Sequence, residues 1–112
     1  MSVDHDSIKA NDLLVEGKRL HDAGKYEEAV ASFDKALEIK PKFADVWNSK
    51  GDALLKLEKY EESIASYDKA IEIDPKNADA WVNKGVIVAW DLLPKESMKR
   101  GWERKGQKRI AV

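Results

Sequence analysis

The chain has 112 residues, of which 43% are hydrophobic and 37% are charged, and its formal net charge is only -1. We expect a single folded domain over 1–112, because this length suits one domain and the apolar content is enough for a core. The nearly balanced charge excludes a strongly basic or acidic protein, and the absence of cysteine excludes a disulfide framework and a thiolate metal site.

The N-terminal residues lack the pattern of an export signal. Residues 1–6 are acidic and polar, whereas a secretory signal begins with basic residues that an apolar stretch follows. The longest apolar run, residues 86–90, is far shorter than the roughly 20 residues that span a bilayer. We therefore expect a cytoplasmic protein that contacts no membrane.

The chain contains an internal repeat. Residues 24–42 and 58–76 are identical at most positions when the two stretches are aligned. The same shift aligns residues of one type elsewhere, namely Trp47 with Trp81, and Gly17 with Gly51 and Gly85. A repeat at this interval, about 34 residues, indicates an array of stacked structural units.

The first unit covers about residues 10–43. Apolar and small residues recur in it at helical spacing, and a proline follows them: Leu13, Gly17, Leu20, Ala29, Phe33 and Pro41. The unit therefore has the pattern of a helical pair.

The second unit, about 44–77, predicts one helix over 44–57 and another over 60–73. Acidic residues in the first turn of the later helix favour the positive end of its dipole. Pro75 ends that helix, because proline lacks an amide donor and clashes with the preceding turn.

The third unit, about 78–112, departs from the pattern. Pro94 and Gly101 stand where the earlier units have aromatic residues. We expect a divergent unit that ends in a capping helix, since terminal repeats usually differ from internal ones. Residues 91–112 carry a net charge of +4. A basic end leaves two readings open, a solvated capping helix or a nucleic-acid contact; we expect the former, without a nucleic-acid partner.

These units resemble the tetratricopeptide repeat family, whose pattern is Trp-x2-Leu-Gly-x2-Tyr, then Ala-x3-Phe, then Pro in each repeat. The second unit offers Trp47-x2-Lys50-Gly51-x2-Leu54, Ser63-x3-Tyr67 and Pro75. The resemblance implies an all-α fold, a right-handed superhelical stack of antiparallel helix pairs. It also implies a protein–protein interaction module, and no enzyme.

Packing explains the pattern. The repeated glycines allow two helices to approach closely, and small residues on the facing helix serve the same purpose. One helix pair cannot bury its apolar face alone, so the units must stack. Large aromatic residues are expected to fill the gaps between neighbouring units: Trp47, Tyr60, Tyr67 and Trp81.

The resemblance implies that the first helix of each unit lines a concave groove, where a peptide or helix binds. The corresponding residues here are Asn11, Leu14, Val15, Lys18, Asp45, Asn48, Ser49, Asp52, Lys56, Asp79, Val82, Asn83, Val86 and Trp90. Three of them, Asp45, Asp52 and Asp79, would favour a ligand that carries lysine or arginine.

Val82, Val86 and Trp90 form an apolar stripe at i, i+4 and i+8. Soluble monomers seldom expose such a patch, so something should cover it. Three alternatives are the last helix of the same chain, a second copy of the protein, and an apolar partner helix. Self-association through the third unit is therefore the alternative to groove binding.

Some members of the family bind the terminal carboxylate of chaperone tails with lysine, asparagine and arginine side chains. The corresponding positions here are Leu14, Lys18, Ser49, Asp79 and Asn83. One cation remains, and Asp79 would repel a carboxylate. We therefore expect no binding of chaperone tails.

Residues for chemistry are scarce. The two histidines, His5 and His21, are far apart in sequence and have no cysteine beside them. The glycines match helix contacts rather than a phosphate-binding loop. We therefore expect no catalytic residues, no metal and no cofactor.

Overall fold

The computed structural model describes residues 5–92, and side chains up to residue 89. Within this range the chain forms five helices and no strand, which confirms the predicted all-α class. The helices are α1 (His5–Asp22), α2 (Tyr26–Ile39), α3 (Ala44–Lys56), α4 (Tyr60–Ile73) and α5 (Ala78–Leu92).

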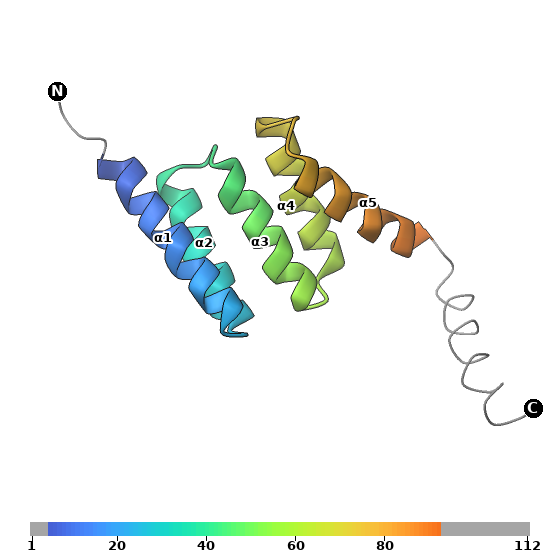
Figure 1. The fold of residues 1–112 in the computed structure, drawn as a ribbon, viewed down its shortest axis with the longest axis horizontal. Coiled ribbons are helices and arrows are strands. Elements are labelled where there is room, and N and C mark those ends of the chain that lie inside the picture. Colours follow the sequence, from blue (N-terminus) through green and yellow to red (C-terminus); the bar gives the residue numbers. More distant parts are fainter. Residues whose placement is uncertain (1–4, 93–112) are drawn as a thin grey trace, which may run out of the picture.

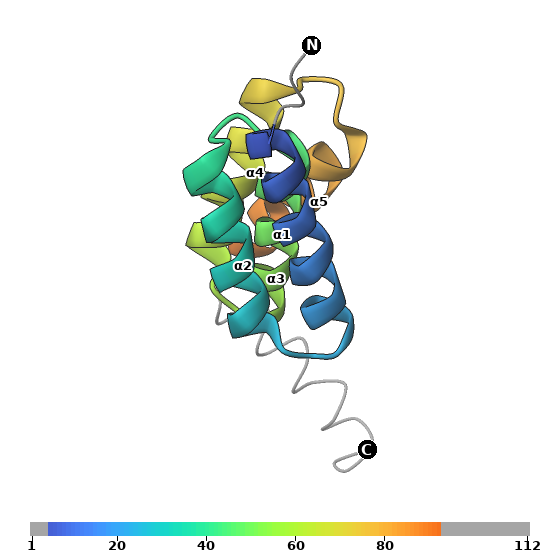
Figure 2. The same ribbon diagram turned by 90° about the vertical axis from the view of Figure 1, so that its left-hand side faces the viewer.

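Each helix packs against the next one in the chain, α1 on α2, α2 on α3, α3 on α4 and α4 on α5. The five helices follow one another along the long axis of the molecule (Figure 1). Seen along that axis, α1 and α5 lie on one side and α2 and α4 on the other (Figure 2). A smaller contact joins α1 to α3.

The observed helix bounds agree closely with those predicted for the second unit. α4 covers 60–73 as predicted, and α3 ends at Lys56, just before the predicted 57. α1 begins at His5, earlier than the predicted start of the first unit near 10. The predicted capping helix lies outside the described residues.

The two turns within the helix pairs share one backbone conformation. Gly24 has a φ of +80°, and Glu58, its counterpart in the next repeat, has a φ of +61°. In both turns an amide just beyond the helix donates back into it, Lys25 to Leu20 and Lys59 to Leu54. These positive φ values place Gly24 and Glu58 in the left-handed region, where glycine fits without strain and other residues do not.

The repeated glycines lie directly against aromatic rings. A Cβ atom added to Gly17 would overlap the ring of Phe33, and one added to Gly51 would stand 2.6 Å from the ring of Tyr67. Both rings are fully buried. The predicted close approach is therefore confirmed in the first two units. At Gly85 an added Cβ would meet nothing within 4 Å.

Two of the predicted gap-filling aromatic residues are exposed instead. Tyr60, the first residue of α4, is 41% exposed, and Trp81 in α5 is 51% exposed. Trp47, the counterpart of Trp81, packs against the core clusters of both units. The indole nitrogen of Trp47 donates to the carbonyl oxygen of Pro41 at 2.7 Å, and that of Trp81 donates in the same way to Pro75 at 2.9 Å.

A repeated ion pair links the helices of neighbouring units. Lys50 Nζ lies 2.6 Å from Asp34, and Lys84 Nζ lies 2.6 Å from Asp68, one repeat later. These lysines occupy the position at which the family pattern has leucine. They replace an apolar contact between units with a charged one, which explains why the substitution is tolerated.

Candidate partner-binding face

The predicted groove residues lie on the first helices of the three units, α1, α3 and α5. We call this surface the α1–α3–α5 face. Its exposed members are Asn11, Val15, Lys18, Asp45, Lys56, Asp79, Val82 and Val86, and its partly buried members are Asn48, Ser49, Asp52 and Asn83. The side chain of Trp90 lies outside the described residues.

Leu14 does not belong to this face. It is only 4% exposed and lies in the core cluster that contains Ala10 and Phe33. The prediction failed because α1 turns this position toward α2. Leu14 is also the first of the positions at which some family members bind the carboxylate of chaperone tails, and its burial removes that position from the surface.

Asp52 joins three helices through hydrogen bonds. The hydroxyl of Tyr67 on α4 donates to Asp52 Oδ1 at 2.5 Å, and the amide of Asn83 on α5 donates to the same oxygen at 3.1 Å. We call these three residues the Asp52 cluster. It lies where the second and third units meet on the α1–α3–α5 face.

Burial perturbs both titratable members of the cluster. Loss of solvent raises the pKa of Asp52, and the negative charge of Asp79 adds to this effect. The hydrogen bond from Tyr67 and the electrostatic effects of His21 and Lys18 lower the pKa of Asp52 and so act in the opposite direction. Burial and the hydrogen bond to Asp52 raise the pKa of Tyr67 above its ordinary value. Asp52 is thus a carboxylate whose charge is poorly solvated.

A pocket of about 260 Å³ adjoins Asp52 between α1 and α3. We call it the α1/α3 pocket. Its walls are Lys18, His21, Asp22, Ser49 and Asp52, with Phe33 of α2 also lining it. The pocket therefore combines acidic, basic, hydroxyl and aromatic groups.

Two buried polar atoms near this surface have no hydrogen-bond partner, Nε2 of His21 and Oδ1 of Asn48. A buried polar atom without a partner costs roughly 1–3 kcal/mol, so such atoms are rare in folded proteins. The ring of His21 is held edge-on against Tyr26, with centroids 5.0 Å apart. The unpaired Nε2 atom belongs to a residue that lines the α1/α3 pocket.

A larger hollow of about 720 Å³ lies on the opposite side of the stack, between α2, α3 and α4. Trp47, Asp34 and Lys50 line it, and the two charged groups pair with each other at 2.6 Å. Asp34 and Lys50 therefore already neutralise each other, in contrast to the charged groups of the α1/α3 pocket.

The repeat itself contains a signal for the Asp52 cluster that the sequence prediction missed. Tyr67 was assigned to packing alone, yet its hydroxyl reaches Asp52. One repeat earlier the same two positions hold Phe33 and Lys18. The hydroxyl and its carboxylate acceptor thus occur together in one unit and are both absent from the other.

Within residues 5–92, no group of three or more histidine, aspartate or glutamate side chains is arranged to hold a metal ion. In the same range no helix has the length and apolar character needed to cross a membrane.

The family model described as TPR repeat matches residues 17–58 and 51–89 of the chain. The two matched segments overlap and together cover well over half of the sequence. No curated protein matches the chain.

Several solved structures are similar to the chain. The TPR2B domain of yeast Sti1 in a pHsp70 complex is 30% identical with a TM-score of 0.70, over 71% of this chain and 64% of that one. The TPR2AB domain of yeast Sti1 in a pHSP90 complex is also 30% identical, with a TM-score of 0.68, over 70% of this chain and 31% of that one. The present chain thus spans less than two thirds of either Sti1 chain.

The second TPR of Spaghetti (RPAP3), bound to the HSP90 peptide SRMEEVD, has a TM-score of 0.73. It is 22% identical, and the match covers 79% of this chain and 83% of that one. At this level of identity the similarity establishes the fold alone.

Proposed function

The chain belongs to the tetratricopeptide repeat family, and on that premise we propose that it is a non-enzymatic adaptor that binds a peptide or helix along the α1–α3–α5 face. The observation that carries the proposal is the α1/α3 pocket, an open space on this face that the half-buried carboxylate of Asp52 lines together with Lys18 and Ser49. The Sti1 and RPAP3 domains, which share its fold, are seen in complexes with HSP90 or Hsp70 or their peptides.

The ligand should differ from those peptides. Of the positions at which some family members bind the terminal carboxylate of chaperone tails, Leu14 is buried and Asp79 is acidic. The amide of Asn83, at a third such position, already donates to Asp52. An acidic tail would meet Asp79 and Asp52, and like charges at short range repel. We therefore expect no measurable affinity for SRMEEVD.

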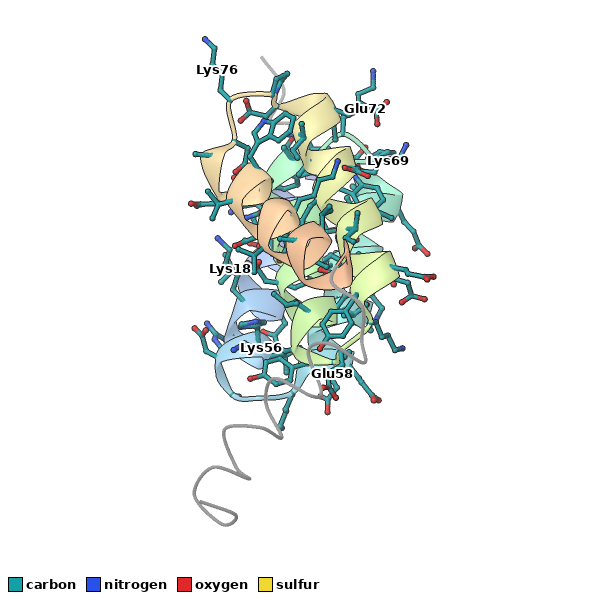
Figure 3. All side chains as sticks on the ribbon, turned by 90° about the vertical axis from the view of Figure 1, so that its right-hand side faces the viewer. Lys18, Lys56, Glu58, Lys69, Glu72 and Lys76 are labelled. Atoms are coloured by element: carbon teal, nitrogen blue, oxygen red, sulfur yellow. The ribbon has the colours of Figure 1, made fainter. Side chains whose placement is uncertain are left out.

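A matched pair of charge reversals tests which face binds. Lys18 lies on the side of α1, α3 and α5, whereas Lys69 lies on the opposite side of the stack (Figure 3). Both side chains are exposed. Short random peptides would be selected by display on the full chain, and their affinities measured by fluorescence anisotropy. We expect Lys18→Glu to change the dissociation constant at least fivefold and Lys69→Glu less than twofold. The opposite pattern would refute the proposal, as would failure to select any peptide.

Self-association through α5 is the second candidate function. Trp81, Val82 and Val86 are 51%, 62% and 61% exposed, which gives α5 an apolar surface in this structure. A second copy that covered it would bury these side chains. Sedimentation velocity would then show a dimer for the wild type and a monomer for the Val82→Lys and Val86→Lys variants. A monomer at all concentrations up to the millimolar range would exclude this candidate.

A further inference from the structure

The α1/α3 pocket has a chemical preference that the family assignment does not supply. Two carboxylates, Asp22 and Asp52, line it beside a single ammonium group, that of Lys18. Asp79 is close enough to Asp52 to oppose its ionisation. An anion placed in this pocket would therefore lie against like charges, whereas a cation would be attracted.

Asp52 has spare capacity to bind a donor. An ionised carboxylate offers about four acceptor positions, and the bonds from Tyr67 and Asn83 both end on Oδ1. These two neutral donors fix the orientation of the carboxylate without neutralising its charge. A half-buried carboxylate held in this way would gain a strong, charge-assisted hydrogen bond from a cationic ligand.

Further acceptor groups line the same pocket. The carboxylate side chain of Asp22 and the hydroxyl side chain of Ser49 belong to its wall together with Asp52. The ring of His21 is also part of the wall, and its Nδ1 atom lies 3.8 Å from Asp22 Oδ1. Several separated acceptor groups thus surround one space.

We propose that the α1/α3 pocket recognises a positively charged side chain of the bound peptide, arginine in preference to lysine, and that Asp52 is its principal contact. A guanidinium group offers five donors in one plane, which suits several separated acceptors better than a compact ammonium group does. The exposed Lys18 side chain opposes this cation and limits its affinity. The inference rests on the proposed function, since it assigns a specificity to the same face.

The composition of selected peptides tests this preference. Display selection from one library of short random peptides would be carried out in parallel on the wild-type chain and on Asp52→Asn. Asparagine has the same shape and still accepts from Tyr67 and Asn83, so only the charge is removed. We expect arginine, and to a lesser extent lysine, to be enriched on the wild type and not on the variant. We also expect wild-type peptides to bind the variant at least tenfold more weakly.

Two further measurements separate recognition from a structural role. Replacing the enriched arginine by citrulline, which keeps its shape without its charge, should weaken binding to the wild type tenfold and binding to Asp52→Asn little. Lys18→Met, which removes the competing charge, should strengthen binding of the same peptide threefold or more. A residue that merely supported the fold would produce neither the citrulline effect nor a gain at Lys18.

The outcomes distinguish failure of the proposed arginine preference from failure of the proposed adaptor function. Selection of peptides without positive charge, or equal binding of basic peptides by Asp52→Asn, would overturn this inference and leave the adaptor function intact. Selection of no peptide by either protein would overturn both.

Discussion

At the scale of single residues, close helix packing depends on glycines that lie directly against aromatic rings. The ring of Tyr67 lies where a side chain at Gly51 would have to stand, and its hydroxyl is tied to Asp52. The ring therefore cannot move aside without breaking a hydrogen bond. Gly85 occupies the same position of the next repeat but has open space around it.

This contrast makes Gly51→Ala and Gly85→Ala a matched pair. Gly51→Ala should lower the free energy of unfolding by about 1–3 kcal/mol, the usual cost of overpacking a core. Gly85→Ala should raise it by about 0.5–1 kcal/mol, because alanine favours helix more than glycine does. Urea unfolding of both variants measures these changes. A loss of stability at Gly85→Ala would contradict the open environment of that residue.

The charge of Asp52 is predicted to oppose folding at neutral pH. Because burial raises its pKa in the folded state, the folded protein binds a proton more tightly than the unfolded chain does. The contribution of this group to stability is therefore greatest at acid pH, below its unfolded pKa, and falls as the pH rises through the raised value. Asp52→Asn removes this dependence.

The advantage in unfolding free energy of Asp52→Asn over wild type should thus be larger at pH 7 than at pH 4. Urea unfolding at the two pH values is the test. A variant that is less stable than wild type at pH 7, and equally so at pH 4, would show that the carboxylate charge supports the fold.

The sequence indicated which residues share this surface but not the hydrogen bonds between them. The resemblance to the family assigned Lys18, Ser49 and Asp52 to one binding surface, and the structure brings these three residues to one pocket. Their role in binding stays a prediction. Spacing cannot report that α1 turns Leu14 inward or that the Tyr67 hydroxyl reaches Asp52, because both depend on how α1 and α4 are rotated against their neighbours. The sequence does contain one sign of that bond, because Phe33 and Lys18 of the first unit are both replaced in the second, by Tyr67 and Asp52.

At the scale of elements, the turn between α3 and α4 repeats the one between α1 and α2 with a poorer residue. Glu58 adopts a φ of +61° where the first unit has Gly24. A side chain in this conformation costs roughly 1–2 kcal/mol, of which part is returned because glycine loses more entropy on folding.

Glu58→Gly should therefore stabilise the protein by about 0.5–1 kcal/mol. The control is Gly24→Ala, which should destabilise it by a similar amount, since Gly24 has a φ of +80°. Thermal unfolding of the two variants measures both effects. If Glu58→Gly melted at a lower temperature than wild type, the strain assigned to this turn would be absent.

The helix bounds of the second unit followed from its sequence because proline and acidic residues mark its ends. The exposed ring of Trp81 did not, because exposure depends on what packs beside α5. Periodicity places Trp81 on the same face as Trp47. It cannot say whether another helix covers that face.

At the scale of the whole molecule, stability should decline toward α5. Each helix of a stacked array draws its stability from its neighbours. Among the described residues α3 packs between α2 and α4, whereas α5 packs mainly against α4. Among residues 5–92, the α1–α3–α5 face thus includes α3, which has a neighbouring helix on either side, and α5, which packs mainly against one.

Native-state hydrogen exchange should reveal this gradient. We expect backbone amides in the middle of α5 to exchange at least tenfold faster than those in the middle of α3, because local opening of α5 disrupts fewer contacts. Equal protection of α3 and α5 would mean that α5 has a second packing partner.

Nuclear magnetic resonance mapping of a display-selected peptide would show whether the α1–α3–α5 face is the binding surface. We expect the largest amide shift changes at Lys18, Ser49, Asp52 and Asn83. Lys69 and Glu72 on the opposite side should not change. Shift changes concentrated on α2 and α4, around the hollow lined by Trp47 and Lys69, would contradict this expectation.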